Sequence, residues 1–527
     1  MSTLGWNLRP HQTYAIDKAM EAFQTKDVVA IQGPTGSGKS LIGMEIAMRF
    51  ASSYYLVPLK ALQDQIAEDF AEKVHVFKGK ANYTCAIDKN IPPASVDKAH
   101  CQGWEGGWQR KKCRDDKVCG YYEAQSKAAG PGVALMNFVL YLCWMRLRES
   151  QAGVFQQRPL HIIDEAHNVE GSIRDFLTME LNEDKVQGYL ETTVHFEADQ
   201  ERDEYVAMLG ELKVANDRQL KLLKDFYGKD LHAVSSEIGS DKLNFHLAFE
   251  QKLEFFLKDD PNYAFGVETR WGFRAKKHIN YLLAKPLNVG GFIRENVVGT
   301  KTLFLSATLP SKSISGMGFQ PEEFAYIDLP STFPAKNRLI RFDAVGRIRQ
   351  SNVEMMMPKI IEKTEVHMDR FPLVKGIIHA PSYSMAETLF KGVGPAYQSR
   401  LILQPRDNGG AMKILDLHRN SPHPTVLLTP GMKEGVDLKN ELSRFQIILK
   451  TPYPSLGDPA VKALADADFG WYINRTIIDF MQMYGRSIRS AEDFAETIIL
   501  DDNLRVVLKD YKAWVPRYIM EAVRWVG

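Results

Sequence analysis

Short apolar runs typical of buried strands alternate with helix-period patterns along most of this chain. The segment DVVAIQGPTGSGKSLIGMEIAMRF, residues 27–50, predicts a strand, a glycine-rich turn and a helix. Similar strand runs recur at SSYYLVPL, PLHIIDEAH, KTLFLSATL, VKGIIHAPSY, TVLLTPG and FQIILKTPY, with helical patterns between most of them. This alternation predicts an α/β fold in which helices cover parallel sheets.

Two stretches interrupt the alternation. Residues 80–122 hold four of the five cysteines, and residues 168–300 are mostly helical in pattern, as in DEYVAMLGELKVANDRQLKLLKDFY. We interpret the second stretch as a helical insertion projecting from the first sheet. The proline-containing segment IDLPSTFPAKNRLIRF predicts a link between two α/β domains, residues 1–320 and 321–527.

Length and composition fit a soluble protein of at least two domains. The 527 residues exceed the size, roughly 250 to 300, at which single cores stop growing. Hydrophobic residues make up 45% and charged residues 25%, which argues against a disordered or membrane chain. The net charge of +1 means that an anionic polymer would need a local basic groove. The N-terminus lacks the apolar core of a signal peptide, so we expect a reducing cytoplasm or nucleoplasm and no membrane contact.

The strongest chemical signal is GPTGSGKS, from Gly33 to Ser40, which fits the phosphate-binding loop G-x-x-x-x-G-K-[ST] in full. Glycines let backbone N–H groups turn toward phosphates, helped by the N-terminus of the helix that follows. Lys39 is expected to contact the β- and γ-phosphates, and the Ser40 hydroxyl to bind magnesium. The alternative is a chance glycine-rich turn, which the flanking strand and helix patterns disfavour. The predicted ATP-binding residues here are Gly33, Thr35, Gly36, Ser37, Gly38, Lys39 and Ser40.

A second motif, HIIDEAH, places Asp164 and Glu165 at the end of a predicted buried strand. Asp164 would hold magnesium, and Glu165 would polarise or deprotonate the attacking water. Taken alone, such a strand end is more often an exposed loop, but the phosphate-binding loop upstream reverses these odds. In QMYGRSIRS, Arg486 and Arg489 are three apart and are expected to share a helical face, from which they could act as arginine fingers. The alternative for this pair is a solvated helix surface.

In order, GPTGSGKS, DEAH, SATL, TPGMKEGVDL and QMYGRSIRS resemble motifs I, II, III, V and VI of superfamily 2 helicases. The chain more specifically resembles the XPD/DinG family of iron-sulfur DNA helicases over about residues 9–502. CGYYEAQSKAAGPGVALMNFVLYL resembles that family's last cluster cysteine, paired tyrosines and following strand, and DEAHNVEG its extended motif II. STFPAKNR, KGIIHAPSYSM and EGVDLKNELSRFQIILKTPYPSLGDP resemble further segments in family order.

The resemblance implies two RecA-like motor domains with ATP and Mg²⁺ in their cleft. An iron-sulfur insertion (residues 80–122) and an arch insertion (residues 168–300) would both belong to the first motor domain. Gln12 would read adenine, while Gln482, Arg486 and Arg489 would contact the γ-phosphate from the second domain. The implied activity is ATP-dependent 5′ to 3′ translocation on single-stranded DNA with unwinding of forks, by a motor expected to be monomeric. Both insertions are compact for the family, which leaves the preferred DNA structure open.

The four clustered cysteines are Cys85, Cys101, Cys113 and Cys119, separated by 15, 11 and 5 residues. In a reducing compartment, clustered thiols hold a metal more often than they form disulfides. Four thiolates suit either zinc or a four-iron four-sulfur cluster, so ligand chemistry leaves the choice open. The family resemblance favours the iron-sulfur cluster, as a structural support for a DNA-separating wedge. Cys143, in YLCWM, is expected to be a core residue on an apolar helix.

Basic and aromatic residues near Cys113 form a candidate DNA surface, since cations track phosphates and aromatics stack on unpaired bases. The alternative, a solvated face and a small module core, is equally favoured. Rival functions are a translocase that removes proteins or RNA from DNA, and a non-catalytic scaffold in a repair, replication or defence complex. RNA is a further candidate substrate. The residues proposed to contact DNA are Arg110, Lys111, Lys112, Tyr121 and Tyr122.

Overall fold

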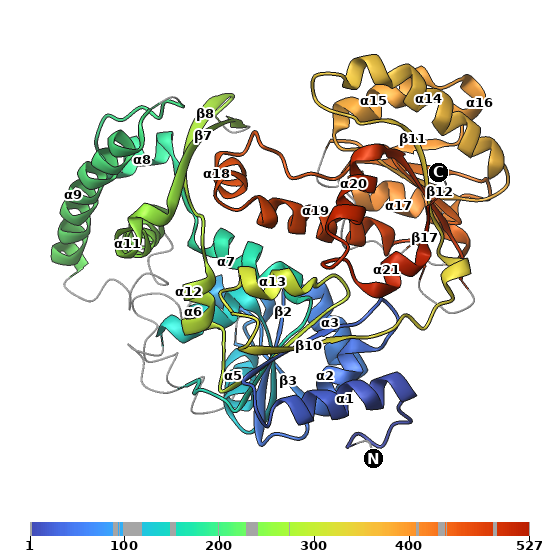
Figure 1. Cartoon of the computed structure of the whole chain (residues 1–527). Helices are drawn as coiled ribbons and strands as arrows, with labels where there is room; N and C mark the ends of the chain where they lie inside the picture. The colour runs from blue at the N-terminus through green and yellow to red at the C-terminus, as the bar shows by residue number, and fades with distance from the viewer. Residues whose placement is uncertain are drawn as a thin grey trace.

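The computed structural model describes residues 3–87, 93, 95–98, 118–147, 154–198, 200–227, 241–272, 275–406, 410–430, 438, 440–488 and 493–525. Two parallel-sheet domains and a smaller inserted unit make up the molecule (Figure 1). The predicted α/β fold class, with two RecA-like domains, is confirmed. None of the helices within the described ranges is long and apolar enough to cross a membrane.

The first domain is built on a seven-stranded parallel sheet. Apolar residues occupy both faces of most of these strands, because helices cover the sheet on both sides. In spatial order they are β10 (Phe324–Asp328), β1 (Val28–Gln32), β9 (Lys301–Ser306), β5 (Leu160–Ile163), β2 (Ser52–Val57), β4 (Gly132–Asn137) and β3 (Val74–Val76).

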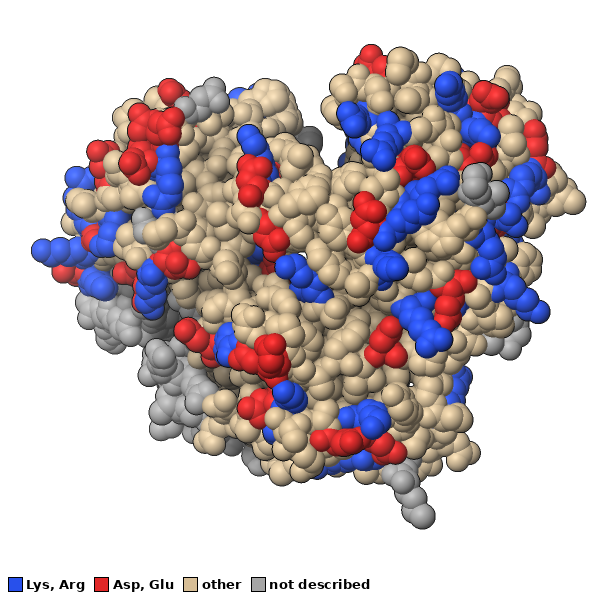
Figure 2. Space-filling model, in the orientation of Figure 1, with Lys and Arg blue, Asp and Glu red and all other residues tan. Residues whose placement is uncertain are grey.

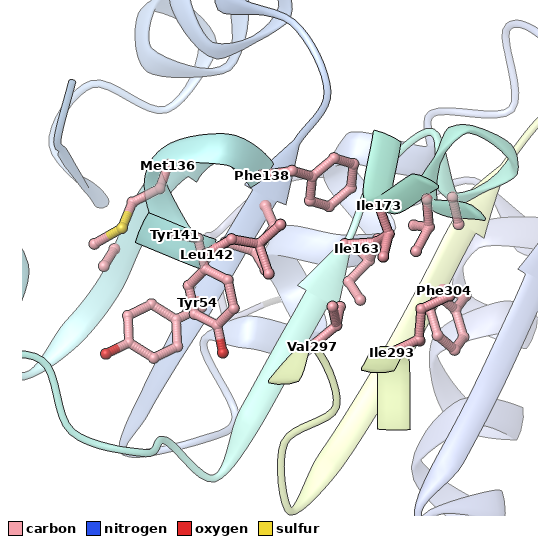
Figure 3. Close-up of a cluster of buried hydrophobic side chains, with 14 of the residues drawn as sticks. Tyr54, Met136, Phe138, Tyr141, Leu142, Ile163, Ile173, Ile293, Val297 and Phe304 are labelled. Atoms are coloured by element: carbon pink, nitrogen blue, oxygen red, sulfur yellow. The ribbon is translucent and has the colours of Figure 1, made fainter. Parts of the chain in front are cut away.

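Alternate residues of these strands face two separate cores. In β2, Tyr54 and Leu56 join one core, shown in Figure 3, whereas Tyr55 and Val57 join the other. The core of Tyr54 is covered by α5 (Gly120–Ala129), α6 (Phe138–Leu147), α7 (Val169–Leu177), α12 (Gly290–Asn296) and α13 (Ser311–Gly316). The core of Tyr55 is covered by α1 (Pro10–Ala22), α2 (Lys39–Ala47) and α3 (Lys60–Asp69).

The second domain repeats this plan with another seven-stranded parallel sheet. Its spatial order is β13 (Leu401–Leu403), β14 (Val426–Thr429), β12 (Gly376–His379), β15 (Phe445–Ile448), β16 (Glu496–Asp501), β11 (Ile340–Gly346) and β17 (Val523–Arg524). The helices are α14 (Val353–Arg370), α15 (Tyr383–Gly392), α16 (Pro395–Gln398), α17 (Gly410–Asn420), α18 (Pro459–Ala467), α19 (Phe469–Tyr484), α20 (Asp502–Asp510) and α21 (Arg517–Ala522). Strand β10 pairs with β1, so the first sheet extends past the predicted boundary at residue 320, and the connection between the sheets follows Asp328.

The inserted unit, called the arch here, spans residues 179–286 and has its own hydrophobic core. It was predicted to be helical over residues 168–300, but α7 and α12 at the two ends pack on the first domain instead. The arch also contains an antiparallel sheet that the helical interpretation missed, in the order β6 (Met179–Asn182), β8 (Lys277–Pro286), β7 (Tyr263–Gly272). Three helices accompany this sheet, namely α8 (Glu183–Leu190), α9 (Arg202–Tyr227) and α11 (Asp241–Lys258).

Candidate active site

The predicted phosphate-binding loop connects β1 to α2 and includes two residues in the left-handed region. Gly36 has φ +80° and Gly38 has φ +76°, conformations that only glycine adopts without strain. A Cβ atom on Gly36 would lie 2.4 Å from Cζ of Phe333, and one on Gly38 would lie 2.3 Å from Nε2 of Gln12. Both glycines are therefore required by backbone conformation and by close approach, and the predicted strand, loop and helix are present.

Two side chains brace this loop from within. Lys39, the first residue of α2, donates to the carbonyl oxygen of Gly33 at 3.1 Å. Gln12 is buried on α1, where its Oε1 accepts from the Arg9 N–H at 2.8 Å and its Nε2 donates to the Ser37 carbonyl at 3.1 Å. The Gln12 amide thus ties α1 to the phosphate-binding loop.

The two acidic residues follow β5 at the carboxyl edge of the same sheet. Asp164 is buried, and the Ser40 hydroxyl donates to its Oδ2 at 3.4 Å, so the two predicted magnesium ligands lie together. Burial raises the pKa of the Asp164 carboxyl, and the neighbouring Glu165 carboxylate raises it further. Glu165 is partly exposed and has φ +48°, which is rare for a residue with a side chain. Together the acids and the loop form one polar edge.

A hydrogen-bonded chain joins this edge to the second domain. Gln482, near the end of α19, donates from Nε2 to the Thr308 hydroxyl at 2.6 Å and to Nε2 of His167 at 2.9 Å. His167 in turn lies 2.8 Å, through Nδ1, from the Ser306 hydroxyl, which donates to Glu165 at 3.4 Å. Gln482 of the second domain is therefore linked by hydrogen bonds to two segments of the first domain, residues 165–167 and 306–308.

A cavity of about 340 Å³ opens between the two domains at this point. Its lining combines the predicted phosphate contacts with groups from both sheets. The first domain contributes Thr35, Lys39, Glu165, His167 and Thr308, and the second contributes Gln482, Arg486 and Tyr518. The cavity is thus a site that both domains complete.

The arginines differ from expectation in their secondary structure. Helix α19 ends at Tyr484, and Gly485, a poor helix former, follows it. Arg486 therefore lies in a turn beyond the helix, buried, with one guanidinium nitrogen 3.1 Å from Oε1 of Gln482. The prediction that Arg486 and Arg489 share a helical face is wrong in this respect, and Arg489 lies outside the described residues.

Two of the four predicted cluster ligands are described, and both are buried free thiols. Cys119 precedes α5, and Cys85 lies two residues after Tyr83, whose ring is 3.8 Å from the position of a Cβ on Gly120. The two ends of the cysteine segment thus return to the same place at the edge of the first domain. Cys101 and Cys113 lie outside the described residues. Cys143 is exposed on α6, so its prediction as a core residue is wrong.

Of the candidate DNA contacts, only the two tyrosines lie within the described residues. Tyr121 is 4% exposed and packs against Phe77 and Tyr83 with ring centroids 5.4 and 5.6 Å apart, which places it in the core of the first domain. Tyr122 is partly buried beside it and keeps an accessible edge. Arg110, Lys111 and Lys112 lie outside the described residues.

Tyr55, His167 and Thr308 are site residues that the sequence did not single out. His167 and Thr308 belong to the quoted motifs DEAH and SATL, which could have identified them. Tyr55 carries no such signal, because its hydroxyl meets Asp164 across two strands, 109 residues apart in sequence.

Comparisons with known proteins indicate similarity to helicases. The family model for the helicase C-terminal domain matches residues 373–522, and that for the type III restriction enzyme res subunit matches residues 5–194. The chain is 21% identical to the ATP-dependent DNA helicase YoaA of Haemophilus influenzae, covering 94% of this chain and 90% of that protein. For YoaA of Escherichia coli the identity is 22%, covering 97% and 93%.

Solved structures show the same fold. A structure of an XPD helicase superposes with a TM-score of 0.62 at 17% identity, covering 96% of this chain and 98% of that one. The structure of S. tokodaii Xpd4 gives 0.60 at 13% identity, covering 98% and 100%. The two family-model matches, the YoaA relatives and the two-sheet architecture together support a helicase motor of superfamily 2. Within that class, the chain is an XPD/DinG-like helicase.

Proposed function

We propose that this protein is an ATP-dependent DNA helicase that translocates 5′ to 3′ on single-stranded DNA and unwinds forks. The observation that carries the proposal is the cavity between the sheets, in which Lys39 and Glu165 from one domain meet Gln482 and Arg486 from the other. A site divided in this way can change shape when a phosphate is bound or lost, which is how cleft closure drives a motor. The names of the YoaA relatives support ATP and DNA as its substrates.

In this proposal, the phosphate-binding loop and Lys39 hold the β- and γ-phosphates, and Gln12 would read the adenine edge. Ser40 and Asp164 would hold Mg²⁺, which supplies positive charge to the phosphate oxygens. Glu165 orients a water and accepts its proton as the water oxygen attacks the γ-phosphorus and the bond to the bridging oxygen of ADP breaks. Arg486, together with Arg489, offsets the charge that develops on the γ-phosphoryl oxygens.

The contact between Gln482, His167 and Thr308 supplies the coupling between hydrolysis and movement. His167 lies within 3.4 Å of Glu165, so loss of the γ-phosphate beside Glu165 changes the surroundings of the histidine that Gln482 binds. Because Gln482 belongs to α19, such a change is transmitted to the second domain. Each cycle of closing and opening would then advance the strand.

For the cysteine segment we propose an iron-sulfur cluster held by Cys85, Cys101, Cys113 and Cys119. Support comes from the burial of Cys85 and Cys119 where the two ends of the segment meet. When bound, the cluster would cross-link the segment that carries its four ligands. That segment, with Tyr122 and the basic residues Arg110, Lys111 and Lys112, is the candidate wedge and DNA contact. Basic and acidic side chains are interspersed on the face shown in Figure 2, so a local groove is needed for DNA.

The test combines iron content, ATP hydrolysis and strand separation on one anaerobic preparation. We expect about four irons per chain, an ATPase that single-stranded DNA stimulates, and unwinding of 5′-tailed forks. Lys39→Ala should abolish hydrolysis and unwinding while leaving DNA binding intact. Displacement of streptavidin from DNA without unwinding would instead indicate the translocase. An ATPase indifferent to DNA would refute the helicase.

A further inference from the structure

Tyr55 occupies a special place in the first sheet. It lies on β2, between β5 and β4, and is fully buried beneath the helix that carries the end of the phosphate-binding loop. Its neighbour Tyr54 is equally buried but faces the other core, part of which is drawn in Figure 3. Both tyrosines keep a hydroxyl in the protein interior, where a polar group is costly unless it is hydrogen-bonded.

The Tyr55 hydroxyl meets the proposed magnesium carboxylate. It donates to Oδ2 of Asp164 at 2.9 Å, the same oxygen that the Ser40 hydroxyl approaches at 3.4 Å. The other oxygen, Oδ1, accepts from the Glu165 N–H at 2.9 Å. Each oxygen of the buried carboxylate therefore has a fixed donor, and the plane of the carboxylate cannot turn without breaking a hydrogen bond.

The space for this tyrosine depends on a glycine. Gly43 lies inside α2 directly over the phenol, and a Cβ there would come within 3.1 Å of the Tyr55 hydroxyl oxygen and 2.7 Å of Cδ1 of Leu305. Glycine in a helix interior costs about 1 kcal/mol relative to alanine, so it needs a packing reason. Gly43 thus lets α2 lie close to β2 while the Tyr55 hydroxyl reaches Asp164.

We propose that Tyr55 is a positioning residue for the metal carboxylate, holding Asp164 in the orientation in which one oxygen faces Ser40. The inference rests on the proposed function, because it assigns Ser40 and Asp164 to Mg²⁺. A donor held behind a ligand carboxylate orients it, and losing such a partner typically lowers metal affinity about 10- to 100-fold. The phenol stays buried throughout and does not itself contact the nucleotide.

The chain offers a matched pair of variants to test this. Tyr55→Phe removes the hydroxyl that reaches Asp164, whereas Tyr54→Phe removes one that donates to the Gln156 carbonyl at 2.7 Å on the other face. Both changes delete a single oxygen from a fully buried ring on the same strand. Any general effect of a lost buried hydrogen bond should therefore appear in both variants.

The readout is the Mg²⁺ concentration needed for half-maximal binding of a fluorescent ADP analogue, measured beside the Mg²⁺ dependence of ATP hydrolysis. Tyr55→Phe should need about 10-fold more Mg²⁺ in both measurements, with most of the hydrolysis rate restored at high Mg²⁺. Tyr54→Phe should keep the wild-type Mg²⁺ dependence. Gly43→Ala, which crowds the same hydroxyl without removing it, should shift the Mg²⁺ dependence in the same direction as Tyr55→Phe.

The outcomes distinguish a failure of the Tyr55 role from a failure of the proposed magnesium site. Wild-type protein that binds the analogue with no dependence on Mg²⁺ would refute the proposed magnesium site and the inference with it. Wild-type protein with a clear Mg²⁺ dependence that Tyr55→Phe leaves unchanged would overturn the positioning role alone. An equal loss of thermal stability in both phenylalanine variants, without a Mg²⁺ shift, would make Tyr55 a packing residue and also overturn it.

Discussion

Lys285, on strand β8 of the arch, donates to Oδ2 of Asp458, the N-cap of α18 in the second domain, at 2.6 Å. Beside this pair, Gly266 of β7 lies so close to Pro459 that a Cβ would come within 2.7 Å of its Cγ. The arch is inserted in the first domain but also contacts the second domain. Strands β7 and β8 lie beside α18 in Figure 1. Movement between the two domains must therefore strain or release this contact.

Replacing Lys285 with methionine should loosen the arch from the second domain without disturbing the ATP site. The pair is only partly buried, so the loss should be about 1 kcal/mol or less. We expect a wider distribution of distances between dyes on α9 and α18 in single-molecule fluorescence, with ATPase activity unchanged. Lys277→Met is the control, because Lys277 pairs with Asp184 inside the arch at 2.9 Å. Equal broadening in both variants would argue against a bridge between the domains.

Gln482→Ala should uncouple the two domains while leaving nucleotide affinity near its wild-type value. The variant loses the hydrogen bonds to Thr308 and His167, each worth about 1 kcal/mol, so DNA-stimulated hydrolysis should fall at least tenfold. Steady-state ATPase measured beside ADP binding tests this. Thr476→Val serves as a control, since that buried hydroxyl on the same helix donates only to the Tyr472 carbonyl, at 2.9 Å. Unaltered stimulation in Gln482→Ala would contradict the coupling.

Cys119→Ser should remove iron and unwinding but keep some ATP hydrolysis, because the phosphate-binding loop lies in a different part of the sheet. Cys143→Ser should change neither property, since Cys143 is exposed on α6 and is not among the proposed ligands. Iron analysis and a fork assay on both purified proteins provide the comparison. Full unwinding by iron-free Cys119→Ser protein would show that the segment is not the wedge.

Acid should destabilise the first domain through His161. Burial lowers the pKa of this histidine to about 4 in the folded state, against an ordinary value near 6.5. The unfolded chain therefore binds a proton that the folded chain does not, and stability falls as the pH drops from about 6.5 toward 4. Through this one side chain, the free energy of unfolding falls by about 3 kcal/mol as the pH reaches about 4.

The measurement is the urea midpoint of unfolding between pH 7.5 and pH 4.5. His161→Gln should have a shallower pH dependence than wild type over this range, while His423→Gln, at an exposed position, should keep the wild-type slope. Identical slopes in wild type and His161→Gln would show that other groups control acid unfolding.

The parts of the site that the sequence predicted are those that local pattern determines. The phosphate-binding loop, Gly33 to Ser40, was predicted from the strand pattern before it and the helix pattern after it. Asp164 was predicted from the apolar strand run that ends there. Both predictions use only a short stretch of sequence. The hydrogen bond between Tyr55 and Asp164 depends instead on which strand lies beside β5, and no local pattern reports that order. Similarly, Gly485 ends a helix that apolar spacing alone would have continued.

The fold was predicted best where strands are buried on both faces. Strand β10 is only partly buried, at the edge of the sheet, so its weaker apolar run was assigned to the linker. Strands β7 and β8 form a hairpin with one exposed face, in a region dominated by the helical periodicity of α9 and α11. Edge strands and half-exposed hairpins carry less hydrophobic signal than central strands, which explains both differences.

Glu165 carries its carboxylate on a backbone in the left-handed conformation, which costs a side-chain-bearing residue roughly 1 kcal/mol or more. Glycine would adopt that conformation without the penalty, and asparagine with less of it. The folded chain is therefore less stable than it could be at the residue proposed to activate water. Under the proposed function, selection for heat resistance alone would favour Glu165→Gly early and would yield a more stable protein that no longer hydrolyses ATP.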